Sequence, residues 1–195
     1  LRVESDRKIF DELLKDVFGD TLEEPDNEIR VDALKNEVYF GDVPLALNKG
    51  GGLLVPSKSA ELELTPATKN YLRKLARAIQ MNEKLLLVGD TGSGKTAFIR
   101  NIAYLTRNGF KRVNLDGQAD IGDLIGKYVP EEGAGGGFRW QDGDLVKAMK
   151  EGYWILLDEF NLADAEILER INSLLDEDGY LIITEHNNEK VTHQH

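Results

Sequence analysis

A glycine-rich loop that ends in lysine and threonine constrains this chain more than any other feature. The loop reads Gly89-Asp90-Thr91-Gly92-Ser93-Gly94-Lys95-Thr96 and fits the pattern G-x-x-x-x-G-K-[ST]. The mostly apolar run 84–89 suits a fully buried parallel strand, and the segment 95–107 has a helical pattern. A chance glycine-rich turn is the alternative, and this strand–loop–helix context disfavours it.

The residue types of the loop suit phosphate binding. Its glycines let the backbone curl so that successive N–H groups point at phosphate oxygens, and the following helix adds the positive end of its dipole. We expect Lys95 to reach the β- and γ-phosphates and the Thr96 hydroxyl to bind Mg²⁺. Ala97 completes the predicted contact set that begins at Gly89. The loop is therefore predicted to bind a nucleoside triphosphate, with ATP and Mg²⁺ as cofactors.

A second apolar segment, 153–158, is a predicted strand that delivers two acidic residues at its carboxyl end. Open α/β sheets bind their ligands at such strand ends. Asp158 is predicted to hold Mg²⁺, and Glu159 to orient or activate the attacking water. The alternative for this pair is a helix whose first turn is acidic for dipole reasons. Asn161 has two interpretations: it holds Glu159 in an inactive orientation, or it caps the next helix.

Composition limits the kinds of partner. The net charge of −11 argues against nucleic acid and anionic membranes, which attract basic surfaces. The sequence has no cysteine, so disulfides and thiolate metal sites are excluded. No apolar run approaches the ~18 residues of a membrane span, and the N-terminus is too polar for a signal peptide. We expect a soluble chain of the cytoplasm or nucleus, and a piece of a longer protein, because it begins without methionine.

The patterns along the chain predict two parts. Residues 1–58 are expected to form a small N-terminal α+β appendage, and residues 59–195 a partial P-loop core. The appendage is predicted to hold a helix, a linker and short strands, at 5–19, 20–32 and 29–47. The core is predicted to alternate helices with strands, at 66–81, 84–89, 95–107, 112–115, 153–158 and 164–176. This alternation implies an α/β fold with a parallel sheet flanked by helices.

Seven segments match the motifs of one protein family, at 64–78, 89–96, 113–115, 120–126, 138–149, 152–163 and 168–176. Together they resemble the AAA+ ATPases of the dynein-related group, which includes midasin and the MoxR-like proteins, over about residues 62–185. The resemblance implies ATP hydrolysis coupled to the remodelling of a macromolecular complex. It also implies a ring of AAA+ modules, built either as a homo-oligomer or from modules concatenated in one chain, with a protein complex as substrate.

Two β-hairpin insertions are a further implication of the resemblance, at 126–144 and 180–191. In this family such hairpins face the central pore and transmit the nucleotide state to the substrate. Phe138 and Trp140 would lie on a flank of the first hairpin, whose tip is the glycine-rich segment 133–137. The alternative is that both aromatic residues pack in the core.

The chain also departs from the family pattern. It stops at His195, where a fourth strand with a polar sensor residue should begin, and the arginine finger and helical lid would lie further on. We therefore expect weakened binding and negligible hydrolysis by this chain alone. Two other functions stay open: a nucleotide-dependent switch without turnover, and a GTP-using motor of the restriction-type AAA+ group.

Lesser features favour structural explanations. His186, His193 and His195 have no carboxylate at good ligand spacing, so we do not expect a metal site there. Arg139 and Arg170 are candidates for contacts across a subunit boundary, although surface ion pairs explain each of them more simply.

Overall fold

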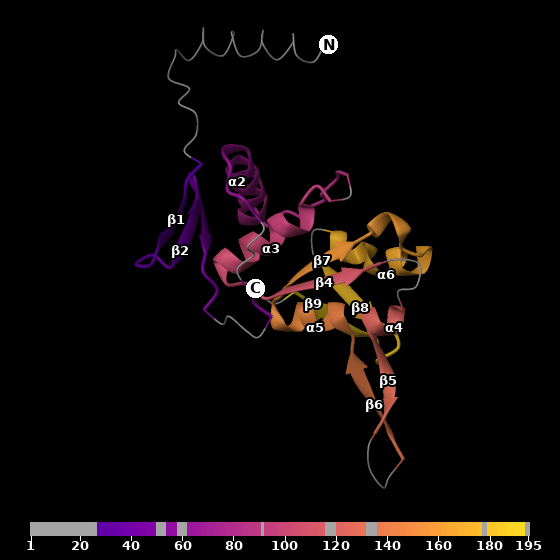
Figure 1. Ribbon diagram of the computed structural model, residues 1–195. Coiled ribbons are helices and arrows are strands. Elements are labelled where there is room, and N and C mark those ends of the chain that lie inside the picture. The colour runs from indigo at the N-terminus through magenta and orange to yellow at the C-terminus, as the bar shows by residue number, and fades with distance from the viewer. Residues whose placement is uncertain are drawn as a thin grey trace.

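The computed structural model describes residues 27–49, 54–57, 62–90, 92–115, 120–131, 136–176 and 179–193 (Figure 1). The helix predicted over 5–19 and most of the linker after it lie outside these residues. Within the described part of the chain, no helix combines the length and the apolar character that crossing a bilayer requires.

A three-stranded antiparallel sheet forms the first described part of the chain. Strands β1 (Ile29–Asp32), β2 (Glu37–Phe40) and β3 (Val43–Ala46) lie side by side in that order. Tight turns join them, and Asn36 and Gly41 adopt positive φ angles of 58° and 64° there. The strands predicted over 29–47 are therefore confirmed.

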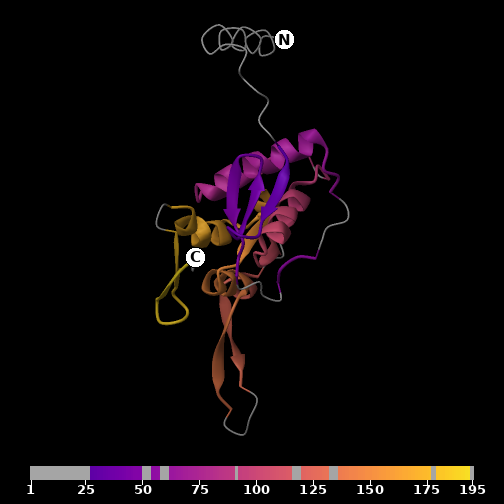
Figure 2. The same cartoon turned by 90° about the vertical axis from the view of Figure 1, so that its left-hand side faces the viewer.

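Two helices pack against this sheet. Helix α2 (Pro66–Gln80) begins at a capping residue, because the Thr65 hydroxyl accepts a hydrogen bond from the N–H of Thr68 at 3.2 Å. Helix α3 (Lys95–Thr106) follows the glycine-rich loop. Figure 2 shows the three strands in front of both helices. The buried side chains between them form one hydrophobic cluster: Val38, Phe40, Val43, Leu45, Leu47, Leu72, Leu75, Ala76, Ile99 and Ile102.

A parallel strand pair holds the second half together. Strand β4 (Phe110–Asn114) pairs with β7 (Trp154–Asp158), so that Asn114 lies opposite Asp158. Around this pair lie α4 (Ile121–Leu124), α5 (Asp144–Glu151), the 3-10 turn η1 (Phe160–Leu162) and α6 (Ala165–Leu175). Buried side chains of these helices, of the residue after β4 and of the C-terminal segment 180–192 form a second cluster: Leu115, Leu124, Ile125, Leu145, Val146, Met149, Ile167, Ile171, Leu181, Ile183 and Val191.

Both predicted hairpins are present. Strand β5 (Gly126–Pro130) pairs with β6 (Phe138–Asp142), and β8 (Tyr180–Ile183) pairs with β9 (Glu189–Thr192). The β5–β6 hairpin projects from the body of the molecule in Figures 1 and 2. Its two aromatic residues differ: Phe138 is 70% exposed, whereas Trp140 packs against the second cluster. Core packing therefore explains Trp140 but not Phe138.

The prediction of a buried strand over 84–89 is wrong for this structure. The segment is irregular and belongs to none of the four described sheets. Leu87 packs against the first cluster, but Leu86 and Val88 are 79% and 83% exposed. A parallel strand buries both faces only when the sheet and its helices surround it. No described strand pairs with this segment, so Leu86 and Val88 remain open to solvent.

Candidate functional site

The glycine-rich loop has a backbone shaped by two glycines. Gly92 and Gly94 have φ angles of 80° and 83°, in the left-handed region that other residues seldom adopt. Between them the N–H of Ser93 donates to the carbonyl of Asp90 at 3.2 Å, which closes a turn. Thr91 lies outside the described residues. The loop therefore turns sharply into α3, with Gly94 as the residue immediately before the helix.

The first turn of α3 has free hydrogen-bonding capacity. Among the described residues, no side chain caps this helix, in contrast to α2 and to α4, where the Asp120 carboxylate accepts from the N–H of Gly122. The opening N–H groups of a helix have no partner within it. At Lys95, Thr96 and Ala97 these donors combine with the positive end of the helix dipole, an arrangement that suits an anion.

Lys95 lies within the loop. Its ammonium donates hydrogen bonds to the carbonyls of Gly89 and Asp90, each at 2.7 Å, and lies 3.3 Å from the hydroxyl of Ser93. These contacts hold the charge beside the loop backbone. Phosphate oxygens bound in the loop would meet this cation at short range, and they would replace neutral carbonyl acceptors with charged ones.

Asp158 ends β7 and is already paired. Its Oδ2 accepts hydrogen bonds from Nε of Arg112 at 2.7 Å and from the terminal nitrogen of the same guanidinium at 2.5 Å. Its Oδ1 accepts from the N–H of Glu159 at 3.0 Å. No local sequence pattern marks Arg112 as a site residue. The residue stands on β4, two positions before Asn114, and only the β4–β7 register brings it to Asp158.

Glu159 has an unusual backbone. Its φ and ψ angles of 53° and 38° lie in the left-handed region, which costs a non-glycine residue about 1–2 kcal/mol. Such outliers cluster at functional sites because the surrounding structure has to hold them. Asn161 is exposed within η1, and α6 begins after Asp164 instead. The prediction that Asn161 caps the next helix is therefore wrong, because η1 intervenes between Glu159 and α6.

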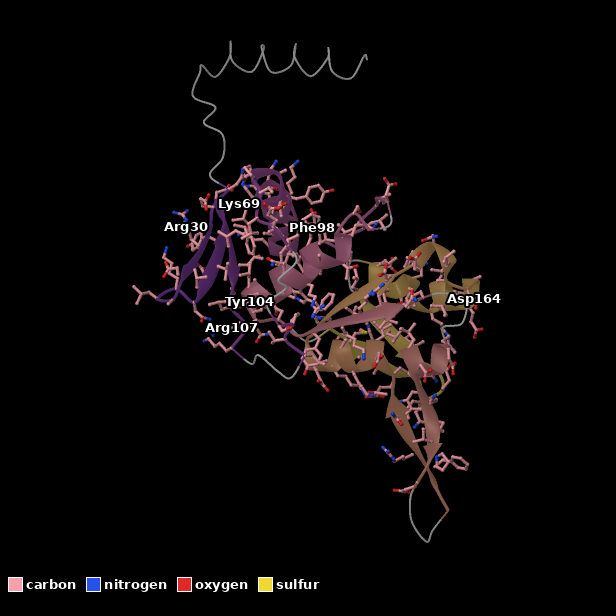
Figure 3. The ribbon with its side chains drawn as sticks, viewed as in Figure 1. Arg30, Lys69, Phe98, Tyr104, Arg107 and Asp164 are labelled. Carbon is pink, nitrogen blue, oxygen red and sulfur yellow. The ribbon has the colours of Figure 1, made fainter. Side chains whose placement is uncertain are left out.

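The chain direction brings the loop and the acidic pair to the same edge of the sheet. Helix α3 starts at the loop and ends just before β4, so it runs opposite to the parallel strands. Figure 3 shows this direction: Phe98 marks the loop end of α3, and Tyr104 and Arg107 mark the other end. The carboxyl ends of β4 and β7 lie on the same side as the loop end of α3 (Figure 1), and Asp158 is the last residue of β7.

The residues present fit a magnesium ion that is shared with phosphate. Asp158 and Thr96 offer a carboxylate and a hydroxyl oxygen, which are hard donors of the kind Mg²⁺ prefers. Among the described residues, no group of three His, Asp or Glu side chains gathers around a common point. Protein ligands alone therefore do not enclose an ion here, and Mg²⁺ is typically bound through one or two side chains plus phosphates and waters.

His186 and Arg170 are in structural contacts. His186 lies 2.7 Å from Glu189 and stacks on Trp140, and no metal-binding group includes it within the described residues. His195 lies outside the described residues. Arg170 pairs with Glu185 and donates to the Thr184 hydroxyl at 2.8 Å. These contacts agree with the surface ion pair expected from the sequence.

Fold and site together define a class. An α/β fold with a parallel strand pair, a glycine-rich loop before a helix and an acidic strand end is that of a P-loop nucleoside triphosphatase. The family model described as an AAA domain of the dynein-related subfamily matches residues 84–195, which is more than half of the chain. The chain therefore belongs to this family, and the resemblance found in the sequence is confirmed.

Two curated relatives are midasins. The chain is 45% identical over 127 residues to midasin of Giardia intestinalis, and 41% identical over 121 residues to midasin of Dictyostelium discoideum. These matches cover 65% and 62% of this chain but only 2% of each relative. The chain is also 33% identical over 100 residues to an uncharacterized protein of Staphylococcus saprophyticus. This match covers 50% of this chain and 38% of that protein.

Proposed function

We propose that this chain binds Mg-ATP in the loop 89–96 and is part of an ATPase that remodels a macromolecular complex. One observation carries the proposal. A helix that no described side chain caps begins at Lys95, directly after two left-handed glycines, and Asp158 ends strand β7, whose carboxyl end lies on the same side as the start of this helix (Figure 1). Membership of the AAA family supports nucleotide-dependent activity.

The proposed roles follow from side-chain chemistry. Lys95 and the N–H groups from Gly89 to Ala97 bind the phosphates. Thr96 and Asp158 hold Mg²⁺, which when bound neutralises charge that develops on the phosphates. Glu159 orients the attacking water and accepts its proton. Asn161 lies close to Glu159 in sequence and acts on its orientation.

The resemblance to midasin supports a multi-module assembly. We propose that this chain works beside other AAA+ modules in a ring, either as a homo-oligomer or within one longer chain, and that its substrate is a protein complex. We keep the division into residues 1–58 and 59–195 as a proposal, and we propose the cytoplasm or nucleus as the location.

A second candidate is a switch that binds nucleotide without hydrolysing it. The Arg112 guanidinium favours this candidate, because it already occupies the Asp158 carboxylate that would hold the metal. In a switch, that ion pair would persist with nucleotide bound. In an ATPase, Arg112 must release Asp158 before the metal binds.

Turnover separates the two candidates. Phosphate release should be measured on a longer chain that continues past His195, with Glu159→Gln as the matched variant. The ATPase proposal predicts steady release by the parent and a loss of about 10²–10⁴-fold in the variant, the usual contribution of a general base. No release above background by either chain would favour the switch, and equal, steady release by both would contradict the role of Glu159.

A further inference from the structure

An aromatic pair lies beside the phosphate loop. Tyr71 of α2 and Phe98 of α3 stack with ring centroids 5.3 Å apart and an angle of 23° between the rings. Phe98 also borders the loop: its N–H donates to the carbonyl of Gly94 at 3.0 Å. A Cβ placed on Gly94 would lie 3.7 Å from Cε2 of the Phe98 ring. The stacked pair therefore extends from the last glycine of the loop onto the surface of α2.

Tyr71 is exposed, although residues close to it on α2 are buried in the first cluster. Its neighbour Leu72 is fully buried, and Leu75 is 6% exposed, so these residues attach α2 to the first cluster. Phe98 is partly buried and packs against the same cluster. Tyr71 is 51% exposed, although it is a large aromatic residue held in place by a stacked partner. It presents a half-open aromatic surface, and its stacked partner Phe98 connects it to the last glycine of the phosphate loop.

We infer that the Tyr71–Phe98 pair is a stacking platform for the base of the nucleotide whose phosphates bind the loop. This inference rests on the proposed function and specifies its substrate class. Every nucleobase has a π-face that stacks on aromatic side chains, and such a contact changes affinity by roughly 5- to 150-fold per base. A purine offers a larger face than a pyrimidine. The site therefore takes purine nucleoside triphosphates, and stacking alone does not separate ATP from GTP.

Calorimetry with four ligands tests the platform. The Mg²⁺ forms of ATP, GTP, CTP and inorganic tripolyphosphate should be titrated into the parent and into Tyr71→Ala. The variant should bind ATP and GTP roughly 5- to 150-fold more weakly, lose less affinity for CTP, and bind tripolyphosphate as the parent does. Tripolyphosphate has no base, so it reports on the loop alone.

Matched variants separate stacking from packing. Tyr71→Phe keeps the ring and should retain the affinity of the parent. Tyr71→Leu keeps apolar bulk without the ring and should lose affinity for purines as Tyr71→Ala does. It keeps the test valid if the smaller alanine side chain impairs folding. Tyr104→Ala removes an aromatic residue from the opposite end of α3 and should change none of the four affinities (Figure 3).

The outcomes distinguish this inference from the proposed function. Suppose that the parent binds ATP, that Lys95→Ala abolishes binding, and that Tyr71→Leu keeps the parental ratio of ATP to tripolyphosphate affinity. The platform is then wrong, and the proposed phosphate site stands. If the parent binds neither ATP nor tripolyphosphate at millimolar concentration, the proposed function fails, and the platform fails with it.

Discussion

A closed set of contacts joins the β5–β6 and β8–β9 hairpins to helix α5. The Trp140 indole donates to Asp142 at 2.8 Å, and Asp142 pairs with Lys150 at 2.9 Å. Lys150 also pairs with Glu189 at 3.0 Å, and Glu189 lies 2.7 Å from His186. The His186 ring stacks on Trp140 with centroids 4.9 Å apart and an angle of 9°. Hydrogen bonds from Lys150 and then His186 lower the pKa of Glu189 below its usual range.

We predict that Trp140 and His186 stabilise the fold cooperatively. A stacked aromatic pair contributes about 0.5–1.5 kcal/mol beyond the area that it buries. The Lys150 side chain is 37% exposed, so each of its ion pairs adds only about 0.2–1 kcal/mol. A double-mutant cycle of Trp140→Leu and His186→Leu should therefore give a coupling free energy of about 0.5–1.5 kcal/mol. Urea unfolding followed by far-ultraviolet circular dichroism measures it at neutral pH.

A second cycle is the control. His193 lies near the same hairpin, but its ring contacts the carbonyl of Tyr153 at 3.4 Å instead of an indole. Trp140→Leu combined with His193→Leu should show additive effects, within about 0.3–0.5 kcal/mol. If the Trp140–His186 coupling is no larger than that of this control, the stack does not connect the hairpins energetically.

Three other predictions concern the site and its support. Arg112→Gln should strengthen Mg²⁺ binding in the presence of ATP about 2- to 5-fold, the scale of an exposed ion pair, because Asp158 loses its counter-ion. Titration calorimetry measures this affinity. An unchanged or weaker affinity would argue against competition between Arg112 and the metal. A hydrogen bond from Arg73 lowers the pKa of Asp42, so the stability that Asp42 adds is present above its unfolded pKa and is lost as pH falls through its folded pKa. The unfolding midpoints of the parent and Asp42→Asn should therefore converge from about pH 5 to about pH 3, and a constant difference would contradict the assignment. Amides of the segment 84–89 should exchange hydrogen faster than those of β7, and equal protection by mass spectrometry would show that the segment is paired in solution.

Local patterns predicted most of the secondary structure. Helices α2 and α3, the strands of the N-terminal sheet and both hairpins occur where periodicity, turn residues and the family resemblance indicated them. The prediction of a strand over 84–89 was wrong for a physical reason, because a buried apolar strand also needs neighbouring strands. The interpretation of Asn161 as a helix cap was wrong because Asn161 lies inside η1, and Asp164 is the residue before α6.

The contacts that refine the site depend on tertiary structure. Arg112 meets Asp158 across 46 positions of sequence, and only strand register makes them neighbours. Tyr71 and Phe98 belong to different helices, and neither residue type signals a stacked pair by itself. The loop and the acidic pair were recognisable from the sequence because their pattern is local, while their surroundings were not.

The central claim is that the loop 89–96 binds a nucleoside triphosphate, and one measurement tests it most directly. Mg-ATP should be titrated calorimetrically into this chain and into Lys95→Ala, whose folding is checked by circular dichroism. The account predicts saturable binding by the parent, and a loss for the variant of about 1.5–3 kcal/mol or more, the usual worth of a hydrogen bond to a charged group. Absent binding by the parent at millimolar ATP, or equal binding by a folded Lys95→Ala variant, would contradict it.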